Sequence, residues 1–409
     1  MIDREVHNGR TLQDEQFSPR GYLMKPTATT FYALLSCAVL VLPFTAAAAQ
    51  GGDDSQKGTA TLATNSYLST PLTTNSSGGA FVDPNLVNPW GLARSSGGPW
   101  WVSDNGTGLS TLYTGTGSVV PLVVKIPAAK PGSGTLGSPT GIVFNGGQGF
   151  AIGAGKPAVF MFATEDGTVS GWNPQVNPTN AVIAINESEE GASFKGATTA
   201  TAYTPNHPGQ TLLYVANFTL GRVEVFNASF HHVKAIEDAF RGEGDEDQDD
   251  QGGYSPFNVQ NLGGNIYVAY AKRGSGINEQ DGAGLGKVRI FSAEGRPLMK
   301  LQHGAWFNAP WGMAIAPSDF GPYSHSILVG NFGSGWIAAF NPVTGRFQDF
   351  LRDTTGKLVT IPGLWGISPG NDGRAGNATS IYYAAGGAGE QSGVLGTLTA
   401  TQNPQGNDQ

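Results

Sequence analysis

The chain alternates short apolar runs with clusters of glycine, asparagine and proline along most of its length. WWVSD at 100–104, LLYVANF at 212–218 and KVRIF at 287–291 are typical runs. Runs of about four to eight residues that are rich in Val, Ile, Tyr and Phe, and that end in turn-forming residues, predict β-strands joined by hairpins. The pattern therefore predicts an all-β protein.

One local pattern, a glycine turn that leads into an apolar strand, recurs six times. Its copies are NPWGLA (88–93), SPTGIVF (138–144), FKGATTATAY (194–203), SPFNVQNLGG (255–264), NAPWGMAIAP (308–317) and GLWGISPG (363–370). Aligned on Gly91, Gly141, Gly196, Asn258, Gly312 and Gly366, the copies lie 50, 55, 62, 54 and 54 residues apart. A repeat of about 50 residues with four antiparallel strands is typical of one propeller blade, so the chain is predicted to form a six-bladed β-propeller.

The two ends of the repeat region are incomplete in complementary ways. The sixth unit ends with VLGTLT at 394–399 and has no fourth strand, whereas SYLSTPLTT at 66–74 belongs to no unit. An unpaired sheet edge is unfavourable, so we expect the N-terminal strand to complete the last blade and close the ring. The propeller domain is then predicted to span residues 65–400.

The repeated Pro-Trp-Gly string is interpreted chiefly as a packing device. We expect each Trp to wedge between neighbouring blades and each Gly to permit a close approach of two backbones. The alternative is that the tryptophans bind a ligand. The structural residues under the first interpretation are Trp90, Gly91, Trp311, Gly312, Trp365 and Gly366.

The first 49 residues resemble an export signal. Met24 is followed by Lys25, an apolar run from Phe31 to Phe44 and small residues up to Ala49. This order predicts a secretory signal peptide that starts at Met24 and is cleaved near Ala49. The apolar run is shorter than the roughly 20 residues that span a bilayer, which makes a membrane anchor the weaker alternative. A lipoprotein box at Cys37 is a second alternative.

Cleavage near Ala49 would leave a mature chain with short segments on either side of the propeller and no cysteine. We expect a flexible linker at 50–64, a disordered tail at 401–409 and no membrane span in the mature chain. Cys37 is the only cysteine, so the mature protein has neither a disulfide nor a free thiol. The protein is predicted to be periplasmic or extracellular.

Composition narrows the class of partner. The chain has a formal net charge of -8, and only 13% of its residues are charged. Because a polyanion is repelled by such a surface, nucleic acid is excluded as a partner. We expect a monomer that meets an extracellular protein, a glycan or a small molecule.

Five strings resemble a known group of proteins. They are DPNLVNPWGLA (83–93), FNVQNLGGNIYVAYAK (257–272), NAPWGMAIAPSDFG (308–321), LVGNFGSGWIAAFNPVTG (328–345) and GLWGI (363–367). Together they resemble an uncharacterised family of secreted bacterial propeller proteins, similar in fold to NHL-repeat and gluconolactonase-like propellers. The resemblance implies a six-bladed fold and export, and it supplies no activity.

An acidic insertion, EGDEDQDDQGG at 243–253, accounts for the one long interval between repeats. Asp245, Asp247 and Asp249 have the alternate spacing that opens an EF-hand loop, but Asp250 stands where glycine is required and Pro256 where a bidentate Glu belongs. An EF-hand is therefore excluded. A weak cation site at these three aspartates and a solvated acidic loop remain as alternatives.

Polar residues recur beside the starts of the innermost strands and the ends of the second strands. They are Asn88, Asp104, Asn105, Asn217, Asn258, Lys272, Asn308 and Asn331. Because equivalent positions of a ring converge, these side chains are candidates for one central site, in which Asp104 is the only carboxylate and Ca²⁺ is the cofactor best suited to the oxygen donors. The alternative is that each asparagine bonds the backbone of its own turn.

Two classes of function follow. The first is a binding or scaffold module for an extracellular ligand or partner, with Trp172 and Trp336 as candidate exposed aromatics. The second is a divalent-metal-dependent lactonase or esterase with its site at the central channel, where a metal ion polarises the carbonyl. The Glu-Gly-Pro motif of gluconolactonase-like enzymes is replaced by NPW or APW, and the chain carries neither a Gly-x-Ser-x-Gly nor a His-Glu-x-x-His motif, so no catalytic residue is assigned and the first class is favoured.

Overall fold

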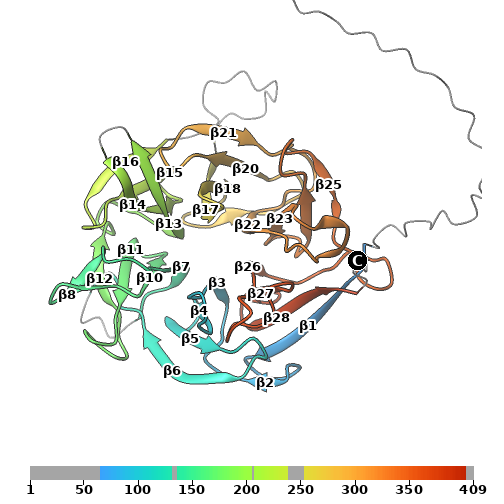
Figure 1. The fold of residues 1–409 in the computed structure, drawn as a ribbon, viewed down its shortest axis with the longest axis horizontal. Helices are drawn as coiled ribbons and strands as arrows, with labels where there is room; N and C mark the ends of the chain where they lie inside the picture. Colours follow the sequence, from blue (N-terminus) through green and yellow to red (C-terminus); the bar gives the residue numbers. More distant parts are fainter. Residues whose placement is uncertain (1–64, 131–135, 205–206, 238–252, 402–409) are drawn as a thin grey trace, which may run out of the picture. The chain divides into compact units, whose positions relative to one another are not determined.

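Six antiparallel sheets are arranged around one axis in the computed structural model, which describes residues 65–130, 136–204, 207–237 and 253–401 (Figure 1). Each sheet is one blade, and the innermost strands line the axis. The predicted six-bladed β-propeller is confirmed. No helix within the described ranges has the length and apolarity needed to cross a bilayer.

The first three blades each contain four strands, ordered from the axis outward. Blade 1 consists of β3 (Pro89–Ala93), β4 (Trp100–Asp104), β5 (Leu109–Tyr113) and β6 (Val119–Lys125). Blade 2 consists of β7 (Pro139–Phe144), β10 (Phe160–Thr164), β11 (Thr168–Trp172) and β12 (Val182–Asn186). Blade 3 consists of β13 (Phe194–Thr204), β14 (His207–Asn217), β15 (Arg222–Phe226) and β16 (His232–Ile236).

The other three blades follow the same order. Blade 4 consists of β17 (Tyr254–Leu262), β18 (Asn265–Arg273), β20 (Gly286–Phe291) and β21 (Pro297–Lys300), with β19 (Glu279–Gln280) paired to β18. Blade 5 consists of β22 (Pro310–Ile315), β23 (Ile327–Asn331), β24 (Ile337–Phe340) and β25 (Phe347–Phe350). Blade 6 consists of β26 (Leu364–Pro369), β27 (Ile381–Ala385), β28 (Val394–Ala400) and β1 (Tyr67–Thr74). Short elements complete the fold: β2 (Phe81–Val82), β8 (Ala151–Gly153), β9 (Lys156–Pro157) and the 3-10 helix η1 (Gly321–Tyr323).

The N-terminal strand β1 closes the ring, as the sequence predicts. It pairs antiparallel with β28, in a register that places Tyr67 opposite Ala400 and Thr74 opposite Val394. The hydroxyl of Tyr67 also donates a hydrogen bond of 2.9 Å to the carbonyl oxygen of Phe320 in blade 5. The first described strand therefore joins the last blade and contacts the blade before it.

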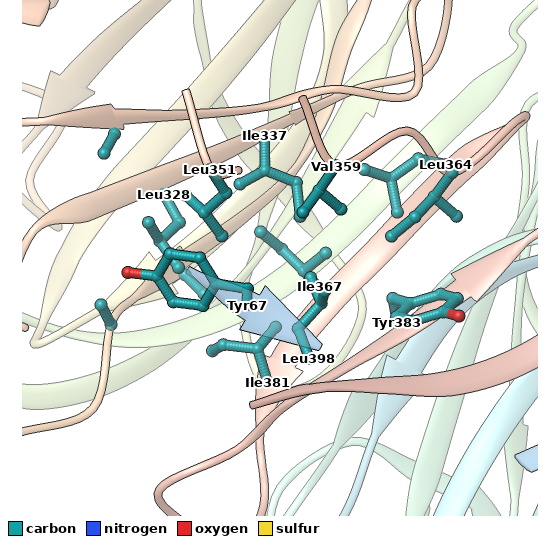
Figure 2. Packing of buried hydrophobic residues seen from close by; sticks show 14 of the residues in the cluster. Tyr67, Leu328, Ile337, Leu351, Val359, Leu364, Ile367, Ile381, Tyr383 and Leu398 are labelled. Carbon is teal, nitrogen blue, oxygen red and sulfur yellow. The ribbon is translucent and has the colours of Figure 1, made fainter. Parts of the chain in front are cut away.

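Side chains from two blades pack around this closing strand (Figure 2). Tyr67 is only 1% exposed and lies among Leu328 and Leu351 of blade 5 and Ile381 and Leu398 of blade 6. Burial of such side chains is the main stabilising contribution in a protein of this kind. Closure therefore depends on an apolar interface as well as on backbone hydrogen bonds.

The anchor glycines mark the closest contacts between neighbouring innermost strands. A Cβ atom on Gly91 would lie 2.5 Å from the carbonyl oxygen of Thr140 in the next blade, and one on Gly366 would lie 2.6 Å from that of Trp90. Gly141, Gly196 and Gly312 face the following blade in the same way. In blade 4, where Asn258 replaces glycine, its side-chain amide donates to the carbonyl oxygen of Trp311 at 2.7 Å. The predicted close approach of backbones thus occurs at each junction that has a glycine anchor.

Candidate functional site at the ring axis

The residue before each anchor lies at the axial end of its blade, and most of these residues are aromatic. In blade order they are Trp90, Thr140, Lys195, Phe257, Trp311 and Trp365. The ring of Trp90 stacks on Trp365 with centroids 3.5 Å apart, and it meets Trp311 edge-on at 6.0 Å and Phe257 at 6.3 Å. These partners come from blades 6, 5 and 4, so the tryptophans meet at the axis and are not confined to seams between neighbouring blades, which differs from the wedge expected from the sequence.

The three indole N–H groups are not equally satisfied. Trp365 donates to the side-chain oxygen of Asn88 at 2.9 Å, and Trp311 donates to the carbonyl oxygen of Lys195 at 3.0 Å. The N–H of Trp90 is buried and has no hydrogen-bond partner in the described part of the chain. A buried donor without an acceptor is unfavourable.

A buried ion pair lies against this aromatic cluster. The ammonium of Lys195 is 2.5 Å from Oε1 of Glu165, and the two side chains are 1% and 17% exposed. The same ammonium lies 5.2 Å from the ring centroid of Trp90 and 5.7 Å from that of Phe218, within the range of a cation–π interaction. Lys195 is therefore held by one carboxylate and by aromatic faces.

Amide side chains extend the ion pair around the axis. Asn105 donates to Oε2 of Glu165 at 2.9 Å. Asn88 donates to the side-chain oxygen of Asn105 at 3.4 Å and to Oε2 of Glu390 at 2.7 Å. The chain of contacts runs from Lys195 in blade 3 through blades 2 and 1 to Glu390 in the β27–β28 loop of blade 6.

A third carboxylate, Glu279 of β19, interacts electrostatically with this group. Burial raises the pKa of Glu279 above its ordinary value; the positive charge of Lys195 opposes that rise, and the negative charges of Glu390 and Glu165 add to it. Like charges within a partly buried region disfavour ionisation, which agrees with this direction. We call Glu165, Lys195, Glu279, Glu390, Asn88 and Asn105 the axial polar cluster.

A second set of six residues, one from each blade, lies beside the axis and differs in polarity from blade to blade. At equivalent positions, one residue past the partner of the proline, phenylalanine or leucine that precedes each axial residue, lie Asn105, Glu165, Phe218, Ala271, Phe332 and Gly386 in blade order. Phe218, Ala271 and Phe332 pack with the tryptophans and Phe257, and Phe332 stacks on Trp365 at 4.1 Å. Within this set, blades 1 and 2 thus carry polar side chains and blades 3 and 5 carry phenylalanines.

The structure brings together only some of the residues singled out from the sequence. Asn88 and Asn105 belong to the axial polar cluster, whereas other asparagines bond the backbone or each other. The Asn308 side chain accepts from the backbone N–H of Gly282 at 2.7 Å, and the backbone N–H of Asn308 donates to the side-chain oxygen of Asn331 at 2.8 Å. Asn258 bonds the backbone of Trp311.

Two further candidates from the sequence, Asn217 and Lys272, lie in blades 3 and 4. Asn217 accepts from Thr219 and from the backbone N–H of Leu220, and it donates to buried Glu224 at 3.3 Å. Lys272 has its ammonium 5.2 Å from the ring centroid of Tyr254. Both sets of contacts lie within the residues' own blades.

Asp104 is fully buried inside blade 1. Its Oδ2 accepts a 2.7 Å hydrogen bond from Thr111, and its Oδ1 has no partner in the described part of the chain. Burial raises the pKa of Asp104 well above its ordinary value, the hydrogen bond from Thr111 opposes that rise, and the charge of Asp83 adds to it. The carboxylates beside the axis are instead Glu165, Glu279 and Glu390, which corrects the expectation that Asp104 is the only one.

The residues at the axis do not fit a central calcium ion. Within the described ranges, no three His, Cys, Asp or Glu side chains are grouped so that they could hold a metal ion. The ammonium of Lys195 already lies against Glu165, and a divalent cation at that place would be repelled. Asp245, Asp247 and Asp249 lie outside the described residues.

Lys195 and Glu165 were missed from the sequence, although a positional signal marks both. Lys195 occupies the place that tryptophan takes in units 1, 5 and 6, directly before the anchor glycine. Glu165 occupies the place of Asn105, directly after the second strand. The two tryptophans predicted to be exposed for binding each pack against another aromatic side chain. Trp172 is 5% exposed and packs on Trp101, and Trp336 meets Phe350 edge-on at 5.3 Å.

The fold and the axial polar cluster define a six-bladed β-propeller with a charged group at its axis. The chain belongs to the same family as the uncharacterized protein R648 of Acanthamoeba polyphaga mimivirus, to which it is 30% identical over 297 residues, covering 71% of this chain and 70% of R648. It is also 29% identical over 332 residues to the uncharacterized protein L690 of the same virus, covering 79% of this chain and 83% of L690. These relatives are viral, so the bacterial membership expected from the sequence stays a prediction.

Solved structures resemble the chain at the level of the fold. The streptogramin B lyase structure matches with a TM-score of 0.44 and 13% identity, covering 75% of this chain and 78% of the lyase. A Bacteroides thetaiotaomicron protein of unknown function matches with a TM-score of 0.47 and 13% identity, covering 81% of this chain and 76% of that protein. No protein-family model matches the chain.

Proposed function

We propose that this protein is an exported binding module that recognises an extracellular ligand at the axial polar cluster. The observation that carries the proposal is the buried Lys195–Glu165 ion pair, whose contacts extend through amides to Glu390 of another blade. Buried charge is unfavourable unless it is paired, and this pair joins side chains of two different blades. Polar groups that converge at one place, beside aromatic side chains, are typical of ligand recognition.

Topology supports a single site. Asn88 precedes an innermost strand, while Asn105, Glu165 and Glu390 follow second strands. In an antiparallel blade these positions lie at the same end, as the pairing of Pro89 with Asp104 illustrates. Loops at one end of a rigid scaffold are where binding residues usually occur.

A binding screen tests the role of the cluster. Small molecules, glycans and peptides are tested against the mature chain, residues 50–409, and against Asn105→Ala, Glu390→Ala and Gln148→Ala. Gln148 is exposed in a loop of blade 2, so its substitution is the control. Genuine ligands should bind the wild type and the control and should lose affinity for both cluster variants. Ligands that bind all four proteins equally would overturn the proposal for this site.

Export is tested separately. The full chain is expressed in a secreting host, and the N-terminus of any exported product is determined by mass spectrometry. A product that starts near residue 50 is expected from the signal in residues 24–49. Retention of the intact N-terminus in the cell would contradict export.

A further inference from the structure

The connection between β27 and β28 of blade 6, residues 386–393, differs from the equivalent turns of other blades. In blade 1 the turn is closed by a hydrogen bond of 3.0 Å from the N–H of Gly108 to the carbonyl oxygen of Asp104, and blade 3 closes its turn in the same way. The longer connection of blade 4 is held by the pairing of β19 with β18. The tip of the blade 6 loop, residues 387–391, lies outside any strand, so other contacts must hold it.

A side-chain hydrogen bond joins this tip to another blade. Oε2 of Glu390 accepts a hydrogen bond of 2.7 Å from the side-chain amide of Asn88 in blade 1. Two longer contacts accompany it: the N–H of Glu390 donates to the carbonyl oxygen of Gly387 at 3.4 Å, and the side-chain amide of Asn75 donates to that of Gln391 at 3.4 Å. Hydrogen bonds to a carboxylate are strong, and hydrogen bonds weaken as they lengthen. The Asn88–Glu390 bond is therefore the main contact of the tip.

The backbone of the tip is strained at the residue that makes this contact. Glu390 has a φ angle of 58°, in the left-handed region that residues other than glycine rarely adopt. Such a conformation persists only where surrounding contacts impose it. A Cβ atom on Gly389 would have no atom within 4 Å, so the tip projects into open space. The closed tip is thus a balance between backbone strain and one short hydrogen bond.

The two ends of the loop are fixed, which confines movement to the tip. The N–H of Gly386 donates to a carbonyl oxygen just before β26 at 2.9 Å, and the carbonyl oxygen of Ser392 accepts from the N–H of Asn88 at 2.8 Å. Between these points Gly387 and Gly389 have φ angles of 71° and 76°, and glycine accommodates changes of backbone angle readily. Anchored ends with a tip that can rotate are the construction of a lid.

We infer that residues 387–391 form a lid over the axial polar cluster and that the Glu390–Asn88 bond latches it. This inference rests on the proposed function, since it names how access to the same cluster is controlled. Asn88 also accepts a hydrogen bond of 2.9 Å from the indole N–H of Trp365 and donates to Asn105, so the latch acts directly on the cluster. When the lid opens, the N–H that Glu390 occupied becomes available to an acceptor oxygen of a ligand. A ligand that uses this N–H shifts the lid toward its open state.

Hydrogen exchange of the mature chain tests the lid without any ligand. Glu390→Ala removes the latch, Glu390→Gln keeps an acceptor oxygen and removes its charge, and Gln391→Ala, at the exposed neighbouring position, is the matched control. Mass spectrometry follows the backbone amides of residues 386–393. NMR of protein with isotope-labelled tryptophan follows the indole N–H groups of Trp365 and Trp311. Thermal melting confirms that all variants are folded.

Amide exchange in the loop should accelerate about tenfold in Glu390→Ala, the effect expected for the loss of one hydrogen bond. The effect should be smaller in Glu390→Gln and absent in Gln391→Ala. The Trp365 indole N–H should also exchange faster in Glu390→Ala, because its acceptor Asn88 is uncovered. The Trp311 indole N–H, which is bonded to the backbone of blade 3, should keep its exchange rate.

Two results would overturn the inference. Equal loop exchange in the wild type and Glu390→Ala would show that this bond does not latch the tip. Faster loop exchange with an unchanged Trp365 indole would show that the loop opens without uncovering the cluster. Either result leaves the proposed function to be decided by the ligand screen with Asn105→Ala. A moving lid together with a screen that finds no ligand would count against the proposed function and not against the lid.

Discussion

Lys195 and Glu165 form a salt bridge of 2.5 Å although they belong to different blades and the lysine side chain is only 1% exposed. Removing one member of a buried pair leaves the other charge without compensation. The pair therefore links the stability of the propeller to the same residues that we propose for binding.

Glu165→Gln tests this link. The substitution should lower the free energy of unfolding by roughly 3 kcal/mol, because the buried ammonium loses its counter-charge. Urea denaturation measures the change. The exposed pair Arg296–Glu294, at 4.0 Å, supplies the control: Arg296→Gln should change stability by less than about 1 kcal/mol. Equal effects of the two substitutions would contradict the assignment of Lys195–Glu165 as a buried pair.

Gly366→Ala tests the close contact between blades 6 and 1. The added Cβ would lie 2.6 Å from the carbonyl oxygen of Trp90, so the two innermost strands must separate. We expect a loss of about 1–3 kcal/mol, the usual range for overpacking in a core. Gly97→Ala is the control, since it is the same substitution at a position where the added Cβ has no atom within 4 Å. It should change stability by no more than about 0.5 kcal/mol. Similar melting temperatures for the two variants would show that the ring tolerates the separation.

The buried carboxyl group of Asp104 should make the free energy of unfolding depend on pH. Burial raises its pKa in the folded state above the unfolded value, so the folded state holds the proton more tightly. Its stabilising contribution is complete below the ordinary pKa of Asp and is lost as pH rises through the raised pKa of the folded state. At neutral pH, Asp104→Asn should therefore be more stable than the wild type.

Urea unfolding of both proteins between about pH 4 and pH 8 isolates this effect, because every other titrating group is shared. The advantage of Asp104→Asn should grow with pH and disappear at the acidic end. A constant difference across the range would mean that Asp104 does not titrate differently on folding.

Deletion of β1 tests ring closure. A chain that starts at residue 76 lacks the strand that pairs with β28 and the Tyr67 side chain between blades 5 and 6. It should melt far below a control chain that starts at residue 65, or aggregate through the exposed edge of β28. Coincident melting curves would show that five complete blades and one three-stranded blade suffice.

Local pattern was sufficient to predict much of the fold. Anchors such as Gly91 and Gly366 could be located because strand, turn and repeat signals depend on neighbouring residues, and a repeat fixes which residues are equivalent. Ring closure followed from one missing strand and one surplus strand.

The composition of the axis was harder to predict. The partners of Trp90 come from blades 4, 5 and 6, which are distant along the chain. Lys195 and Glu165 were missed because each is the one charged residue among the equivalent positions of the six blades, so the repeat pattern itself does not predict it. Asp104 shares the strand-end position of Asn217 and Asn331, and its side chain is buried within its own blade. Position in the sequence alone does not show whether a side chain at a strand end faces the axis or the interior of its own blade.

The pairing of β1 with β28 also sets the order of events during synthesis. Ser66 and Thr401, whose side chains share a 2.8 Å hydrogen bond, are 335 residues apart. The first strand of the ring leaves the ribosome before the other strands of all six blades, and its partner β28 is made only after five of those blades. Contacts between such distant segments form slowly, so an unfinished chain displays an unpaired strand for most of its synthesis. Such a chain is suited to being kept unfolded until β28 has been made.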